Sequence, residues 1–202
     1  MIAFLPVALN PTSGVDLKGI TSFFLRAKHW QIFILVFVVY LVGQIALVGS
    51  IMFSKGGLLA GLVMTLSTLS LFVWFWSLGS YFNSIVRPEL RMKSGFFRVA
   101  LIYPPFYFVF FIATFESLSP GLFGLIIPLH LFAMVCMFYL LYFVSKSLVL
   151  AETSKPALFY DYAGPFFLLW FFPIGIWIVQ PKVNRLYSER QNAEPPIETA
   201  PS

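Results

Sequence analysis

The chain has 202 residues, of which 59% are hydrophobic and only 10% are charged, and its mean hydropathy is +0.88. A soluble domain of this size must cover its surface with polar groups, so this composition excludes an ordinary soluble fold. The net charge of +5 does not indicate nucleic-acid binding, because the basic residues stand in short groups beside apolar stretches and form no continuous stripe. We therefore expect the surface to face the lipid bilayer.

Five long stretches contain no Asp, Glu, Lys or Arg. They are 29–54, 56–86, 99–115, 117–145 and 162–181. About 20 helical residues cross the ~30 Å hydrocarbon core of a bilayer, and all but the stretch 99–115 reach that length. Arg98 can extend this shorter stretch by placing its guanidinium at the interface. The sequence predicts an all-α, polytopic helical membrane protein with about five transmembrane helices, or alternatively four plus a re-entrant segment.

Residues 1–29 are predicted to form a lead-in followed by an interfacial helix. Residues 30–181 are predicted to form the transmembrane helical domain. Residues 16–29 mix apolar and basic side chains. That pattern is typical either of an amphipathic helix at the headgroup level or of the basic flank of a membrane helix. The first two transmembrane helices are expected over 31–53 and 58–82. The second is rich in Ser, Thr and Gly, which favour close helix packing and can also line a polar pathway.

The middle of the chain combines a charged loop with a proline pair. The loop 83–98 holds the densest group of charges, and transmembrane helices are expected over 97–115 and 121–144, the latter continuing toward Glu152. Pro104 and Pro105 remove two backbone donors in succession. They predict a kink or a break near the middle of the third helix.

The last apolar element, 162–181, contains Pro173 and Gly175 at its centre. Both residues weaken a helix, which indicates a functional or assembly element rather than a simple anchor. Asp161 flanks it on one side, and Lys182 and Arg185 on the other. If the segment turns back, these flanks meet and Asp161 can pair with Lys182 or Arg185. The polar residues 182–202 are predicted to form a disordered tail.

The distribution of Lys and Arg predicts the orientation. Five transmembrane helices with a cytoplasmic N-terminus place nine basic residues inside and four outside. A re-entrant segment over 162–181 raises the inside count to twelve and leaves one outside. Both arrangements predict a multi-pass protein of the plasma (inner) membrane with its N-terminus in the cytoplasm.

Two short motifs resemble a known group of proteins. The run Phe171-Phe172-Pro173-Ile174-Gly175-Ile176-Trp177, followed by Gln180-Pro181-Lys182-Val183-Asn184-Arg185, is similar to the ending of a group of small bacterial inner-membrane proteins without an assigned function. The stretch Arg26-Ala27-Lys28-His29-Trp30-Gln31 resembles their entry into the first transmembrane helix. The resemblance implies a bacterial inner-membrane protein and supplies no activity.

His130, inside the fourth predicted transmembrane helix, is the candidate for holding a cofactor. A membrane haem usually needs two axial histidines, and His29 lies at the membrane edge, so we expect His130 to be a hydrogen-bonded packing residue and expect no cofactor. Ser77, Tyr81 and Asn83 can bind a lipid headgroup, or can belong to an ordinary interfacial belt.

Catalytic and metal-binding motifs are absent from the sequence. It contains no His-Glu-x-x-His pair, no Gly-x-Ser-x-Gly elbow and no phosphate-binding glycine loop, and Cys136 is its only cysteine. We expect a protein that is not an enzyme, binds no metal, and acts as a subunit or accessory factor beside other membrane proteins or copies of itself. The alternatives are a small transporter or channel built on the interrupted helices and, less favoured, an enzyme acting on lipid.

Overall fold

The structure of the chain, a computed structural model, describes residues 17–52, 58–114 and 120–193. These residues form helices and contain no strand. The elements, in chain order, are α1 (Leu17–Arg26), α2 (His29–Ile32), the π-helix η1 (Phe33–Val38), α3 (Val39–Met52), α4 (Leu58–Ile85), the 3-10 turn η2 (Pro88–Leu90), α5 (Gly95–Thr114), α6 (Pro120–Thr153), α7 (Phe159–Trp170) and α8 (Phe172–Ala193).

Three helical stretches are long and apolar enough to cross a bilayer, namely His29–Ser50, Leu59–Ile85 and Gly124–Thr153. A shorter apolar stretch, Gly95–Phe111, belongs to α5. The prediction of an all-α membrane protein is therefore confirmed. The expected continuation of the fourth helix to Glu152 is also confirmed, because α6 ends at Thr153.

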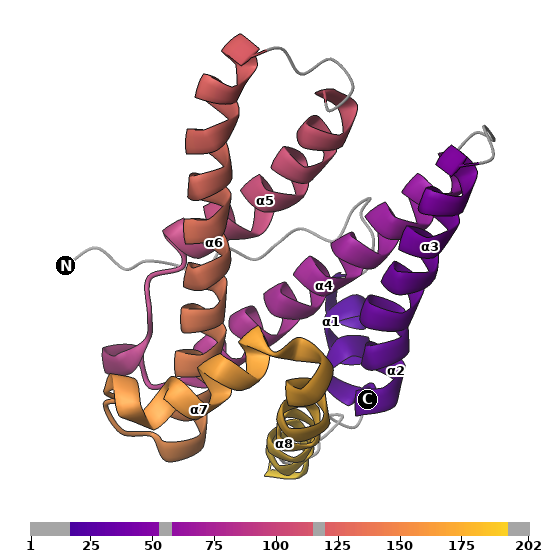
Figure 1. Cartoon of the computed structure of the whole chain (residues 1–202). Helices are drawn as coiled ribbons and strands as arrows, with labels where there is room; N and C mark the ends of the chain where they lie inside the picture. Colours follow the sequence, from indigo (N-terminus) through magenta and orange to yellow (C-terminus); the bar gives the residue numbers. More distant parts are fainter. Residues whose placement is uncertain (1–16, 53–57, 115–119, 194–202) are drawn as a thin grey trace, which may run out of the picture.

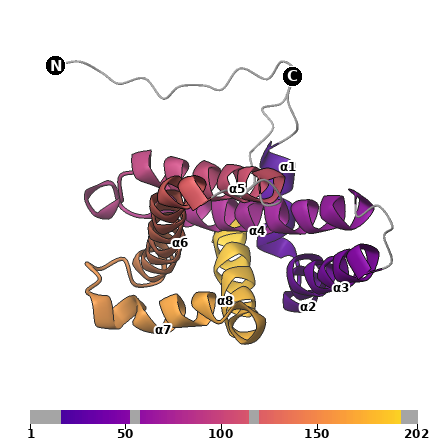
Figure 2. The same cartoon turned by 45° about the horizontal axis from the view of Figure 1, so that its top comes forward.

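The helices α3–α4 and α5–α6 form two hairpins that diverge like the arms of a V (Figure 1). Two regions can be distinguished in this arrangement. The packed base comprises α1, α7, α8 and the adjoining parts of the hairpins, which are 72–85, 95–101 and 136–153. The open end comprises the distal parts of the arms, which are 39–52, 58–71, 102–114 and 120–135. With the open end tilted toward the viewer, α4 and α5 lie side by side, whereas α8 stands below α4 (Figure 2).

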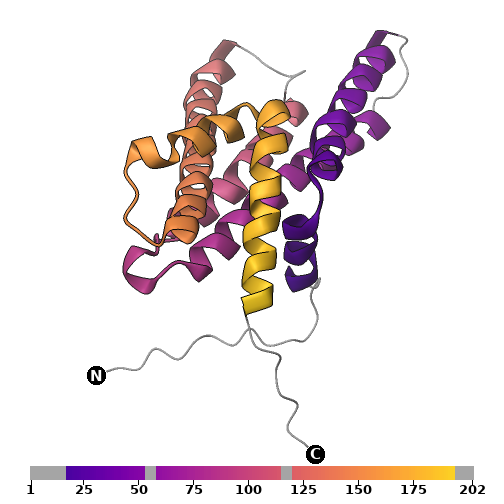
Figure 3. The same ribbon diagram turned by 90° about the horizontal axis from the view of Figure 1, so that it is seen from below.

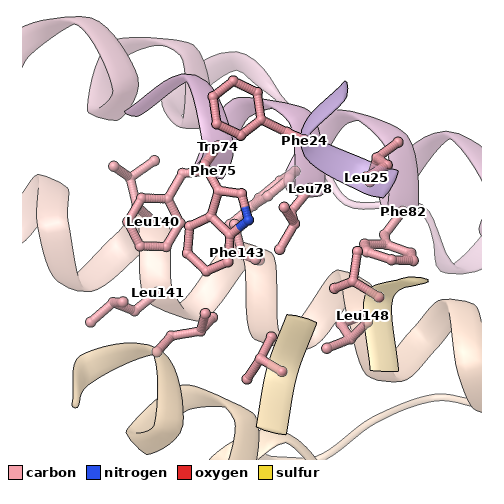
Figure 4. Packing of buried hydrophobic residues seen from close by; sticks show 14 of the residues in the cluster. Phe24, Leu25, Trp74, Phe75, Leu78, Phe82, Leu140, Leu141, Phe143 and Leu148 are labelled. Carbon is pink, nitrogen blue, oxygen red and sulfur yellow. The ribbon is translucent and has the colours of Figure 1, made fainter. Parts of the chain in front are cut away.

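The buried hydrophobic cluster belongs largely to the packed base. Trp74, Phe75 and Leu78 of α4 meet Leu140 and Phe143 of α6 there, and all five side chains are at most 2% exposed (Figure 4). Burying an aromatic or leucine side chain of this kind contributes roughly 1.5–3 kcal/mol in a soluble protein. In a bilayer, tight van der Waals packing must supply most of the corresponding attraction.

The first transmembrane stretch contains a feature that the sequence did not indicate, the π-helix η1. Its wider turn is visible where the amide of Val39 donates to the carbonyl of Ile34, five residues earlier. The Ser67 hydroxyl of α4, which is 1% exposed, donates to the carbonyls of Leu35 and Val36 at 3.0 and 2.8 Å. The side chain of a second helix thus satisfies carbonyls inside the π-helical turn.

The sequence predicted a kink or a break at Pro104 and Pro105, and the predicted break was wrong. Both residues lie inside α5, which runs from Gly95 to Thr114 as one element, and both are buried. The same part of α5 packs against α6, where the Tyr103 hydroxyl donates to the Leu129 carbonyl at 3.0 Å. Tertiary contacts of this kind let a membrane helix tolerate prolines.

The single transmembrane helix expected over 162–181 is instead two helices. α7 ends at Trp170, and the chain turns at Phe171 before α8 begins. The amides of Ile174 and Gly175 both donate to the Phe171 carbonyl, at 3.0 and 2.8 Å. A Cβ at position 175 would overlap the carbonyl of Leu168, so only glycine fits this turn.

The turn changes the direction of the chain, so that α8 runs at a steep angle to α7 (Figure 3). The single continuous helix of the five-helix prediction is therefore absent over 162–181. The predicted disordered tail over 182–202 was wrong for 182–193, which continue α8. The remainder of that tail and the predicted lead-in over 1–15 lie outside the described residues.

Candidate functional site: an apolar cavity between the helical hairpins

A cavity of about 530 Å³ lies where the two arms of the V meet. Its walls come from η1 and α3 on one side and from α5 and α6 on the other, with α4 and the α7–α8 turn between them. Three of the predicted site residues line it: Pro104 of α5, His130 of α6 and Pro173 of α8. Residues that lie far apart in the sequence therefore meet at one place.

The polar side chains of this cavity already have partners within the protein. Ser67 donates to the π-helix as described above, and the Thr68 hydroxyl donates to the Met64 carbonyl at 2.9 Å. The Tyr40 hydroxyl accepts a hydrogen bond from the Gln44 amide at 2.8 Å. The remaining lining residues are mostly large and apolar, and none of them is charged.

His130 contacts a single polar side chain in the described part of the chain. Its Nδ1 lies 3.2 Å from the Tyr107 hydroxyl, and both residues line the cavity. His29 does not line the cavity, because its ring packs against Trp177 with centroids 4.5 Å apart. The two histidines are therefore not arranged as a pair around this cavity. No group of three or more His, Cys, Asp or Glu within 17–52, 58–114 and 120–193 has a metal-binding arrangement.

The predicted pairing of Asp161 with Lys182 or Arg185 does not occur. The Asp161 carboxylate instead accepts a hydrogen bond of 2.7 Å from the Leu158 amide at the start of α7, which is a helix-capping role. Glu152 at the end of α6, instead of Asp161, pairs with these two basic residues. Its carboxylate lies 2.5 Å from Lys182 Nζ and 3.6 Å from Arg185 Nη2.

The predicted headgroup candidates are used within the protein. The Ser77 hydroxyl donates to the Val73 carbonyl, and the ring of Tyr81 packs on Tyr187. The amide of Asn83 forms two hydrogen bonds of 2.9 Å with the backbone of Met92, one in each direction. Asn83 thus closes the loop between α4 and α5.

The sequence analysis assigned no individual role to two residues of the packed base. Gln180 is fully buried, and its side chain accepts a hydrogen bond from the Trp74 indole and donates to the carbonyls of Phe24 and Ala27. Asn184, one turn later, donates to the carbonyls of Leu25 and Ala27. These two side chains satisfy the free carbonyls where α1 ends.

This contact explains why the Gln180–Arg185 stretch was distinctive. On one face of α8, the amides at positions 180 and 184 hold α1 and α4, while on another Lys182 and Arg185 hold α6. The sequence feature that could have indicated this contact is the pair of side-chain amides of Gln180 and Asn184. They are four residues apart and therefore share one helix face. Their partners at the end of α1, however, lie more than 150 positions away in the chain.

The fold and the cavity define an all-helical membrane protein. Comparisons with family models, with curated proteins and with solved structures find no match to this chain.

Proposed function

We propose that this chain is a non-catalytic subunit or accessory factor of a bacterial inner-membrane complex, and that its cavity receives an apolar segment of a membrane partner. The observation that supports the proposal most is the cavity itself, which lies open between two diverging hairpins and is lined by apolar side chains. Interfaces between membrane helices rest on packing of such surfaces rather than on charge.

The position of the charges supports a binding role over ion transport. The described carboxylates are Glu89, Glu152, Asp161 and Glu189, and none of them lines the cavity. Ion-coupled transporters and proton pumps usually hold ionisable groups near the middle of the membrane. Among the described residues that line this cavity, Tyr107 and His130 form a titratable pair.

The orientation is part of the proposal, with the charged end of the packed base on the cytoplasmic side of the membrane. Twelve of the thirteen Lys and Arg residues of the chain fall in or beside the packed base. They are Lys18, Arg26, Lys28, Arg87, Arg91, Lys93, Arg98, Lys146, Lys155, Lys182, Arg185 and Arg190. The positive-inside rule then favours the cytoplasmic side for this end of the molecule. A cysteine at position 93, in a Cys136→Ser background, should resist impermeant thiol reagents in intact cells, and ready labelling would contradict this orientation.

Photo-crosslinking tests the partner. A photoreactive amino acid in place of Met134, which lines the cavity, should capture a discrete membrane protein, whereas the same group in place of Val135, on the other side of α6, should capture chiefly lipid. The buried Ala133 gives the decisive variant. Ala133→Phe narrows the cavity and should weaken the crosslink at 134, while Val135→Phe should leave it unchanged. Equal capture in both variants would contradict a partner in the cavity.

A small transporter is the second candidate, because two proline-containing elements and His130 line one cavity, as expected around a transport site. The two functions differ in the water content of the cavity. A cysteine at position 133, again without Cys136, should react with a small impermeant thiol reagent if the cavity belongs to an aqueous pathway. We expect no reaction from either side of the membrane, and rapid reaction would favour the transporter.

A further inference from the structure

The outer face of α4 and α5 carries a second hollow, which has an apolar part and a polar part. The apolar part, about 390 Å³, is lined by Leu69 and Val73 of α4 and by Ile102 and Phe106 of α5, among others. The polar part, about 280 Å³, is lined by Ser80, Ser84, Arg91 and Ser94, among others. Trp76 and Arg98 line both parts, so the two adjoin and form one groove, which we call the α4–α5 groove.

The polar part of the α4–α5 groove is positively charged. Arg98 and Arg91 are both exposed, and neither forms an ion pair with a carboxylate within the described part of the chain. Arg91 is nevertheless held in place, because its Nη2 donates to the carbonyls of Ser84 and Val86 at 2.6 and 3.3 Å. Two guanidinium groups beside serine hydroxyls match the geometry and charge of a phosphate.

The groove lies at a suitable depth for a lipid. Arg91 and Arg98 stand where α4 has ended at Ile85 and α5 begins at Gly95, which is one end of the apolar helices. From Arg98 the apolar part follows α5 to Phe106, and these eight residues span about 12 Å along the helix axis. One leaflet of the hydrocarbon core is about 15 Å thick. The apolar part therefore matches the length of chain that a lipid places in one leaflet.

We propose that the α4–α5 groove binds one anionic phospholipid of the phosphatidylglycerol type. Its phosphate contacts Arg98 and Arg91, and one acyl chain lies between α4 and α5 as far as Phe106. A free phosphate would leave the apolar part of the groove unoccupied. A zwitterionic lipid would place the cation of its headgroup next to two arginines, which repel it. This site lies outside the cavity assigned to a membrane partner, so it is independent of the proposed function.

Quenching of Trp76 fluorescence by brominated lipids tests the site in the full-length protein in mild detergent. The difference between the parent and Trp76→Phe isolates the signal of Trp76. Brominated phosphatidylglycerol should quench this residue at about a tenfold lower lipid fraction than brominated phosphatidylcholine, as expected from charge-assisted hydrogen bonds to the phosphate. Equal quenching by the two lipids would overturn the proposal.

Two matched pairs of variants locate the contacts. Arg98→Gln should remove most of the tenfold preference, whereas Arg87→Gln, which changes the charge equally near the same ends of α4 and α5 but outside the groove, should preserve it. Ile102→Phe should obstruct the acyl chain and reduce quenching by both lipids, whereas Val99→Phe, which does not line the groove, should have no effect. Identical behaviour of Arg98→Gln and Arg87→Gln would mean a general charge effect and would overturn the site.

Two further measurements keep the result interpretable. Arg98→Lys retains the charge and loses the fork of donors, so it should fold as the parent does and keep a reduced preference, about threefold. Inorganic phosphate at millimolar concentration should displace the brominated lipid only weakly. If phosphate displaces it fully and Ile102→Phe has no effect, the groove is a site for free anions and the lipid proposal is wrong.

Discussion

The packed base and the open end of the molecule are built from the same helices but are held together in different ways. In the base, Trp74, Phe82 and Phe143 are fully buried, and side-chain hydrogen bonds join α8 to α1 and α4. In the open end, Ile45 and Met52 of α3 are 73% and 75% exposed in the isolated chain. The two arms meet there around the cavity and along the α4–α5 groove. The stability of the fold therefore comes mainly from the base, and the room for a ligand or partner lies at the open end.

The hydrogen bonds of the base matter more in a membrane than they do in water. An unsatisfied carbonyl or indole N–H in hydrocarbon has no water to bond, and each costs several kcal/mol. Gln180 satisfies three such groups at once. At the open end the hydrogen bonds are local, within one helix or between paired helices, as at Tyr103 and Leu129. We expect substitutions in the base to have larger effects than comparable substitutions at the open end.

Gly175→Ala should have the largest effect, because its added methyl group overlaps the backbone carbonyl of Leu168 and no side chain can move to relieve the overlap. The cost should be at or above the upper end of the roughly 1–3 kcal/mol found for overpacked sites. The yield of monodisperse protein in detergent should fall accordingly. Gly164→Ala in α7 is the control, since its methyl group meets no atom within 4 Å and should be neutral or slightly stabilising. Similar behaviour of the two variants would mean that the α7–α8 turn is not as described.

Gln180→Leu should come next. The substitution leaves the Trp74 indole and the Phe24 carbonyl without partners, while Asn184 still reaches the carbonyl of Ala27 at 3.2 Å. We expect a loss of roughly 2–4 kcal/mol, measured as a lower midpoint of thermal unfolding in detergent.

A double-mutant cycle separates the indole hydrogen bond from the rest of this loss. Trp74→Phe removes the orphaned donor, so the double variant should be more stable than the sum of the two single changes predicts, by about 1 kcal/mol or more. Strict additivity would show that the Gln180–Trp74 contact contributes no stability.

Much of this fold could be predicted from the sequence because a bilayer imposes simple rules. Uncharged stretches of about 20 residues located the long helices, and the break near Pro173 and Gly175 was visible in the residue types. The continuity of α5 through Pro104 and Pro105 could not be predicted in this way, since it accompanies contacts with α6. The π-helix was equally hidden, because the group that satisfies it, Ser67, belongs to another helix.

The candidate site was predictable only in part, for a similar reason. Pro104, His130 and Pro173 stood out individually as residue types that are unusual inside a membrane helix. Their meeting at one cavity depends on how α5, α6 and the α7–α8 turn pack together. The sequence analysis did not identify Glu152 as the partner of Lys182, because Asp161 is nearer in sequence to the segment 162–181.

Glu152→Gln should have a moderate effect. The Glu152 and Lys182 side chains are about 30% exposed, and such partly exposed pairs contribute less than a buried pair would. We expect a loss of about 0.5–1 kcal/mol that diminishes as salt is added, since salt screens this pair. The thermal unfolding midpoint at low and high salt provides the measurement. A loss that does not depend on salt would argue against an electrostatic role for the pair.

His130→Ala should have the smallest effect and gives the sharpest contrast with the base. His130 is exposed at the cavity, and its bond to the Tyr107 hydroxyl joins α5 to α6 at 3.2 Å, within one arm of the V. The substitution frees a hydroxyl that lines an open cavity rather than one enclosed by close packing, so the cost should be at most about 0.5 kcal/mol. Tyr107→Phe should match it, because each change removes the same single bond. The unfolding midpoint and the absorption spectrum of the purified protein test this directly. If His130→Ala lowers the midpoint as much as Gln180→Leu does, or abolishes a haem spectrum present in the parent, then His130 is a ligand-holding residue and the open end is not the weakly constrained region inferred from its packing.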